Sequence, residues 1–119
     1  MSSDGAAIRG RILDMIDFID HATRYAQGLA LGDFQRDRRT RDAVERNLIL
    51  LGEASRHVPE ALQAHYRDHP WRYLADMRNR LVHDYRRIDG AIVWGVVTLH
   101  LSPLRDALFS MLADVEGAA

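Results

Sequence analysis

The chain of 119 residues is long enough for one domain with a buried core and too short for a catalytic domain plus a separate regulatory one. Its hydrophobic content of 47% and charged content of 28% are typical of a globular protein and exclude a disordered tail. The absence of cysteine excludes disulfides and thiol nucleophiles, and a formal net charge of −1 excludes binding to nucleic acid through a globally basic surface. Any nucleic-acid contact must therefore be local.

The apolar pattern predicts helices along most of the chain. A first amphipathic helix is expected over residues 6–28. A second long helix begins within 33–40 and ends before Pro59, which can also open a short helix through Tyr66.

A further long helix is expected over residues 71–83, and it is followed by a loop at 86–90 in which Asp89 is placed to cap the next helix. The last helix covers residues 91–116, and Pro103 is expected to kink or divide it. No strand-like alternation of useful length is visible. The sequence therefore predicts an all-α fold with a single domain over 1–119, built as an up-down bundle of four to five helices.

The start of the chain has neither the basic residues nor the apolar run of a signal peptide. The longest apolar-rich stretch, residues 91–101, is interrupted by Gly95, Thr98 and His100 and is too short and too polar for a membrane span. We therefore expect a cytoplasmic protein that does not associate with membranes.

The helix expected over residues 71–83 carries the main candidates for catalytic residues. Helical spacing places Leu74, Met77 and Leu81 in one narrow stripe that must face the core. Asn79 and His83 are four residues apart on the opposite side and are expected to contact each other.

Arg78 lies at the flank of the apolar stripe, about 140° around the helix from His83, so the two are not side by side on one straight helix. A symmetric dimer, in which this helix surface meets its copy, would let two Arg78 and two His83 side chains line one groove. An arginine and a histidine without metal ligands fit RNA cleavage by attack of the ribose 2′-hydroxyl on the neighbouring phosphate, with His83 moving a proton and Arg78 stabilising the developing charge. Whether His83 acts as acid or base stays open.

The segment Arg78-Asn79-x-x-x-His83-x-Tyr85 resembles the Arg-x4-His-x-Tyr signature of HepT-like toxins, a branch of the HEPN ribonuclease superfamily. Other blocks of the chain resemble that family in the same order, namely residues 41–48, 52–54, 70–71, 77–85, 93–94 and 101–104. The resemblance covers residues 37 to 104.

The resemblance implies a metal-independent endoribonuclease toxin that needs no cofactor, is usually dimeric and belongs to a type II/VII-like toxin-antitoxin pair. It implies Arg78 and His83 as the catalytic residues, with Asn79 in support. In that family the partner is a minimal nucleotidyltransferase antitoxin, which attaches AMP to the motif tyrosine, here Tyr85. A bulky anionic adduct two residues from His83 would block the groove and repel phosphate.

Each of these residues also has a simpler structural interpretation. In this interpretation, His83 does no more than interact favourably with the dipole at a helix C-terminus. Arg78 does no more than pair with an acidic residue of its own or a neighbouring helix. Tyr85 does no more than pack its ring. Glu45 and Glu53 are better placed to fix arginines within the bundle than to act in catalysis.

Four further arginines form either a solvated face or a contact surface for RNA or the antitoxin. They are Arg80 on the motif helix and Arg38, Arg39 and Arg41 near the start of the second long helix. His65 and His69 have the spacing of a helical metal site, but Pro70 interrupts the helix there and no metal is expected. The alternative function is a non-catalytic helical subunit that presents substrate or a docking surface to a nucleotidyltransferase.

Overall fold

The computed structural model describes residues 3–117, and within that range it is helical and contains no strand. The elements in chain order are α1 (Ser3–Ala26), α2 (Leu31–Arg36), α3 (Arg38–Ser55), α4 (Glu60–Ala64), α5 (Trp71–His83), the 3₁₀ turn η1 (Tyr85–Arg87), α6 (Gly90–Gly95), the π-helical segment η2 (Val96–His100) and α7 (Leu101–Gly117). The expected all-α fold is confirmed. None of the helices within residues 3–117 combines the length and the hydropathy that a transmembrane span requires.

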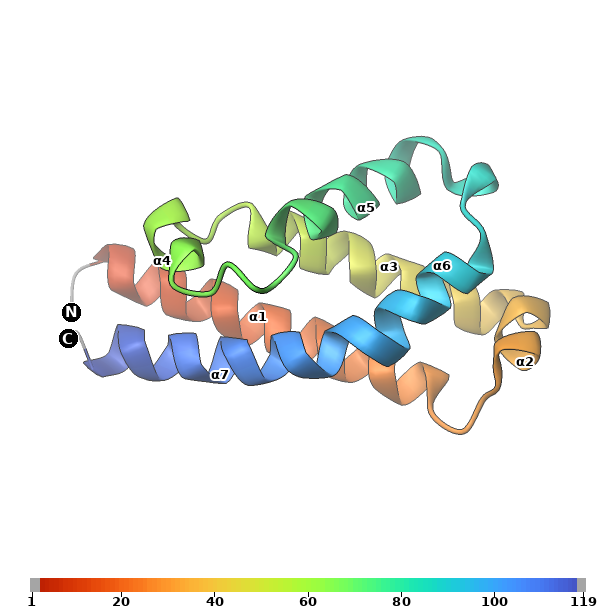
Figure 1. The fold of residues 1–119 in the computed structure, drawn as a ribbon, viewed down its shortest axis with the longest axis horizontal. Helices are drawn as coiled ribbons and strands as arrows, with labels where there is room; N and C mark the ends of the chain where they lie inside the picture. Colours follow the sequence, from red (N-terminus) through yellow and green to blue (C-terminus); the bar gives the residue numbers. More distant parts are fainter. Residues whose placement is uncertain (1–2, 118–119) are drawn as a thin grey trace.

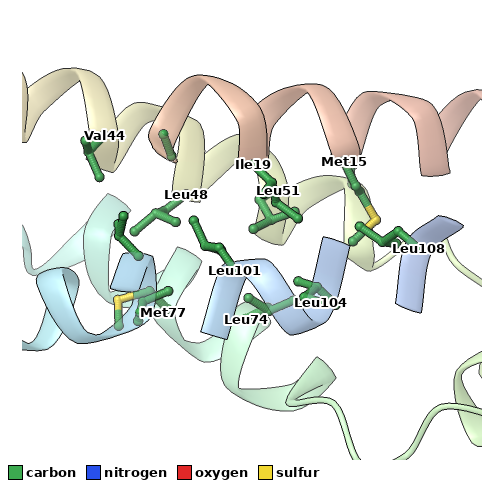
Figure 2. Close-up of a cluster of buried hydrophobic side chains, with 14 of the residues drawn as sticks. Met15, Ile19, Val44, Leu48, Leu51, Leu74, Met77, Leu101, Leu104 and Leu108 are labelled. Atoms are coloured by element: carbon green, nitrogen blue, oxygen red, sulfur yellow. The ribbon is translucent and has the colours of Figure 1, made fainter. Parts of the chain in front are cut away.

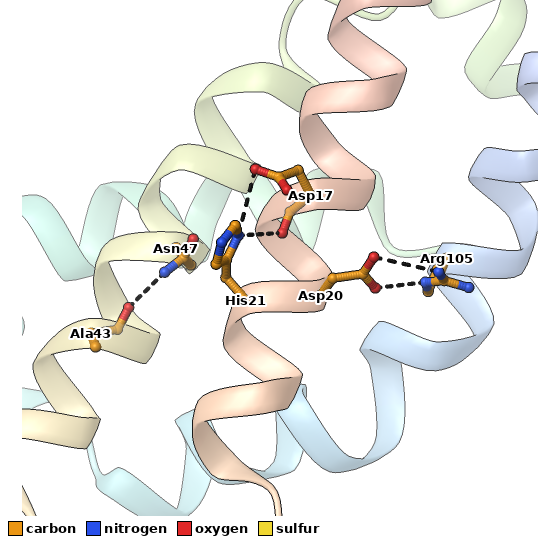
Figure 3. A network of polar contacts seen from close by, with 6 residues as sticks. All are labelled: Asp17, Asp20, His21, Ala43, Asn47 and Arg105. Carbon is orange, nitrogen blue, oxygen red and sulfur yellow. Dashed lines mark hydrogen bonds and ion pairs between the residues drawn. The ribbon is translucent and has the colours of Figure 1, made fainter.

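Four long segments run alternately up and down the molecule: α1, α3, α5 and the run from α6 to α7 (Figure 1). Helix α1 packs against both α3 and α7, and α3 in turn packs against α5. Arg105 of α7 joins α1 through its Nε atom, 2.7 Å from Oδ1 of Asp20 (Figure 3). Helix α5 therefore lies at the edge of the bundle, supported mainly by α3.

The core is apolar and draws on α1, α3, α5 and α7 (Figure 2). Its side chains include Met15, Ile19, Leu48, Leu51, Leu101, Leu104 and Leu108. The stripe predicted for α5 is confirmed, because Leu74, Met77 and Leu81 are all buried. The burial of this stripe determines which residues of α5 face outward.

Short-range signals explain where the helices begin and end. Gly28 has a φ of 81°, a left-handed conformation that suits glycine, and it follows the end of α1. The Asp37 side chain accepts a hydrogen bond of 3.1 Å from the Thr40 backbone nitrogen and starts α3. Bonds from the Thr40 hydroxyl and backbone lower the pKa of Asp37. Asp89 accepts from the Ala91 nitrogen at 2.9 Å, which confirms its predicted role as N-cap of α6.

The C-terminal helix is divided, but slightly earlier than Pro103. The irregularity is the π-helical segment η2, and Pro103 itself lies in the first turn of α7. Proline lacks a backbone N–H, and its ring crowds the carbonyl four residues earlier, which here is that of Leu99. The disturbance caused by Pro103 therefore reaches the turn before it, where the backbone takes the wider π-helical form.

Candidate active site on α5

Helix α5 is attached to the rest of the bundle at its start, and its last turn is closed by a backbone hydrogen bond. At its start, the Trp71 indole nitrogen donates to the Tyr66 carbonyl oxygen at 3.0 Å. The Tyr66 hydroxyl in turn donates to Asp114 of α7 at 2.5 Å, and this bond raises the pKa of Tyr66 to about 12. At the other end, the Asp84 nitrogen donates to the Arg80 carbonyl at 2.8 Å and closes the last turn. The helix thus holds its residues at defined positions along α3.

Gly52 lets α5 approach α3 closely at the level of Arg78. A Cβ atom added at Gly52 would lie 2.5 Å from Arg78 Cβ and 2.7 Å from the Leu74 carbonyl oxygen. Neither contact is tolerable, and one of them involves backbone. Only glycine fits this crossing. The sequence alone does not assign this role, because a single glycine inside a helical pattern is compatible with an ordinary helix.

The Arg78 guanidinium is held by two neighbours. Its Nε atom lies 3.1 Å from Glu53 Oε2 of α3, and its NH1 donates to Asn79 Oδ1 at 3.0 Å. Arg78 Nε and Glu53 Oε2 are both buried. The N–H of Arg78 does not point at Glu53 Oε2 well enough for a hydrogen bond, so their contact is an ion pair. The Arg78 side chain is 23% exposed, so part of it remains accessible from outside.

The interpretation of the two glutamates as partners of arginines is confirmed. Glu53 contacts Arg78 and also lies 3.7 Å from Arg56 NH1, while Glu45 Oε1 lies 3.6 Å from Arg41 NH2. Burial raises the pKa of Glu45, and the positive charge of Arg41 opposes that rise. Glu53 belongs to the surroundings of Arg78 and so to the candidate site.

His83 is the last residue of α5 and is exposed, whereas Arg78 is half-buried against α3. The two residues therefore occupy different sides of the helix, as predicted. The structure forms no hydrogen bond between the described residues Asn79 and His83, and the Asn79 amide oxygen accepts a hydrogen bond from Arg78 instead. Adjacent helical residues do not normally face each other, but the long arginine side chain bends back far enough to reach its neighbour.

Tyr85 opens the 3₁₀ turn η1, two residues after His83. The backbone at Tyr85 is described, but its side chain lies outside the described part of the structure. Next to it, Asp84 Oδ1 lies 3.5 Å from Arg87 Nε. The motif tyrosine therefore lies in a tight turn directly after the helix that carries Arg78 and His83.

The predicted contact arginines lie near the end of the bundle where α5 terminates (Figure 1). Arg80 is exposed on α5, and Arg38 and Arg39 are exposed at the start of α3. Arg41 is half-buried, and its Cζ lies 3.5 Å from where a Cβ would stand at Gly90, just after η1. The fold thus brings the start of α3 beside the turn that follows the motif.

Comparison with known proteins identifies the family of the chain. Residues 15–111 match the family model described as "Ribonuclease HepT-like". The chain is 30% identical to a protein of Thermococcus cleftensis named "Probable ribonuclease HepT", over 77% of this chain and 84% of that protein. It is 26% identical to a protein of Methanocaldococcus jannaschii named as a "Putative RNase", over 92% of this chain and 91% of that protein. No solved structure gives a significant match. The chain belongs to the HepT-like ribonuclease family.

Proposed function

We propose that this chain is an endoribonuclease toxin that cleaves RNA without a metal ion, with Arg78 and His83 as its catalytic residues. One observation carries the proposal. In a chain of the HepT-like ribonuclease family, α5 holds an anchored, partly accessible guanidinium at Arg78 and an exposed imidazole at His83. These two groups supply the positive charge and the proton transfer that phosphodiester cleavage requires.

The proposed reaction transfers the phosphoryl group of one RNA linkage from the 5′-oxygen to the neighbouring 2′-oxygen. The ribose 2′-oxygen attacks the adjacent phosphorus and loses its proton, while the bond from phosphorus to the 5′-oxygen breaks and that oxygen gains a proton. The products are a 2′,3′-cyclic phosphate and a free 5′-hydroxyl. His83 transfers the proton at one of these two oxygens, and Arg78 stabilises the charge that develops on the phosphoryl oxygens.

A homodimer is part of the proposal, because one chain keeps the two groups on different sides of α5. The outward side of α5 carries His83, and Leu99 of η2 is an apolar residue that is 69% exposed. Tyr73 of α5 and His100 of η2 bridge the two elements, with ring centroids 6.0 Å apart. A second copy packed on this surface would cover the apolar side chains and bring its own α5 to the groove.

Mixed dimers test the catalytic pair and the shared groove together. Arg78→Ala and His83→Ala chains carrying different tags are co-expressed, and the mixed dimers are purified through both tags. If each site takes Arg78 from one protomer and His83 from the other, every mixed dimer regains one intact site. Cleavage of a synthetic RNA in the presence of a chelator should then reappear, although neither variant cleaves alone.

Two results would contradict this arrangement. Mixed dimers as inactive as the single variants would place both residues of a site on one protomer. A wild-type protein that binds a nucleotidyltransferase but leaves RNA intact would instead favour the non-catalytic docking subunit.

A minimal nucleotidyltransferase is proposed as the antitoxin partner, with Tyr85 as the site of AMP attachment. The support is the position of Tyr85 in a turn beside His83. The arginines Arg38, Arg39, Arg41 and Arg80 near this end of the bundle are proposed to contact RNA or the partner. An added phosphate group close to His83 would repel the RNA backbone.

Intact-mass measurement tests the modification. Incubation with the nucleotidyltransferase and ATP should increase the mass of the wild-type chain by one or more AMP units and lower its RNA cleavage. Tyr85→Phe should keep its mass and its activity, because the ring remains and only the acceptor oxygen is lost. An equal mass increase in both proteins would assign the AMP to another residue.

A further inference from the structure

We infer that Glu53 is a positioning residue for RNA cleavage, which holds Arg78 so that only the outer edge of its guanidinium is offered to phosphate. The inference rests on the proposed ribonuclease function. It starts from the contact across the α3–α5 crossing, where Glu53 Oε2 and Arg78 Nε lie 3.1 Å apart and both atoms are buried. Gly52, the residue before Glu53, is what allows this approach.

The contact restricts how Arg78 can bind an anion. A guanidinium can hold phosphate either along the edge formed by Nε and one terminal nitrogen or across its two terminal nitrogens. Glu53 occupies the Nε side, and Asn79 accepts from NH1 at 3.0 Å. The remaining N–H groups are on the terminal nitrogens, so phosphate has to be bound by the terminal edge.

The negative charge of Glu53 distinguishes a role in positioning Arg78 from a role in binding RNA. The Glu53 carboxylate is 43% exposed and carries a negative charge within contact distance of the group that is to hold phosphate. Such a charge opposes the approach of RNA in the ground state. A carboxylate there is unfavourable for binding alone, and it is explained if the orientation of Arg78 matters more for the transition state than for affinity.

The test replaces Glu53 with Gln, which keeps an oxygen of similar reach and removes the charge. We expect kcat to fall by roughly 10- to 100-fold, the scale expected when a catalytic group is misplaced by a fraction of an ångström to one ångström. Binding of an RNA whose 2′-oxygens are methylated, and which cannot be cleaved, should be unchanged or tighter. Glu53→Asp, which keeps the charge on a shorter side chain, should have an intermediate kcat.

Arg56→Gln is the matched control, because Arg56 is the other partner of the same carboxylate oxygen, at 3.7 Å, and is exposed. It should leave kcat and binding unchanged. If Glu53 only stabilises the bundle, Glu53→Gln will lower the melting temperature while kcat per folded molecule stays at the wild-type value, and the inference is overturned. If the wild-type protein itself does not cleave RNA, the proposed function fails, which is a distinct result.

Discussion

Replacing His83 with alanine is expected to lower the rate of RNA cleavage by about 10²- to 10⁴-fold, the contribution typical of a general acid or base. The variant should fold normally, because His83 is exposed at the end of α5 and takes no part in the core. The measurement is cleavage of a short RNA by purified protein in the presence of a chelator, together with growth of cells that express the chain without the proposed antitoxin.

His57→Ala is the control for this experiment. His57 is also an exposed histidine that follows a long helix, and it lies outside the candidate site. Its replacement should leave cleavage and toxicity unchanged. Equal RNA degradation by His83→Ala and the wild type would remove His83 from the mechanism.

Replacing Gly52 with alanine is expected to lower the free energy of unfolding by about 1–3 kcal/mol, the usual cost of overpacking a well-packed contact. The new methyl group would meet Arg78 Cβ at 2.5 Å and the Leu74 carbonyl at 2.7 Å, so α5 has to move away from α3. The same movement would separate Glu53 from Arg78. Cleavage per folded molecule should therefore also fall.

Chemical denaturation measures the stability change, and Gly10→Ala is its control. A Cβ at Gly10, within α1, has no described heavy atom within 4 Å outside its own helix and chain neighbours. Alanine there should stabilise the helix by about 0.5–1 kcal/mol, because it removes the entropic cost of glycine. The two substitutions are chemically identical and should act in opposite directions. A Gly52→Ala protein as stable as the wild type would show that the crossing tolerates a methyl group.

Much of the fold could be predicted because the signals that determine it are local. The helical period alone selects the buried stripe of α5, and Asp89 caps α6 within the reach of its own side chain. The separation of α2 from α3 was less visible, because the cap Asp37 lies inside a run of charged residues that all suit a helix surface. The π-helical segment was also missed, since it depends on how the backbone relaxes around Pro103.

The candidate site also contains features that the sequence predicts and features that it does not. The different sides of α5 occupied by Arg78 and His83 follow from helix geometry. The hydrogen bond from Arg78 to Asn79 could not be predicted in this way, because positions around a helix do not determine the path of a long, flexible side chain. The approach of Gly52 to Arg78 joins residues of two helices, and a single sequence does not reveal such a pairing.

The up-down order of the helices has a practical consequence for attaching other polypeptides. Arg9 in α1 and Glu116 at the end of α7 form an ion pair of 3.0 Å, at the end of the bundle far from η1 (Figure 1). A fluorescent protein or affinity tag fused before α1 or after α7 would be attached at that distant end of the bundle. Such fusions should not stand over α5 and η1.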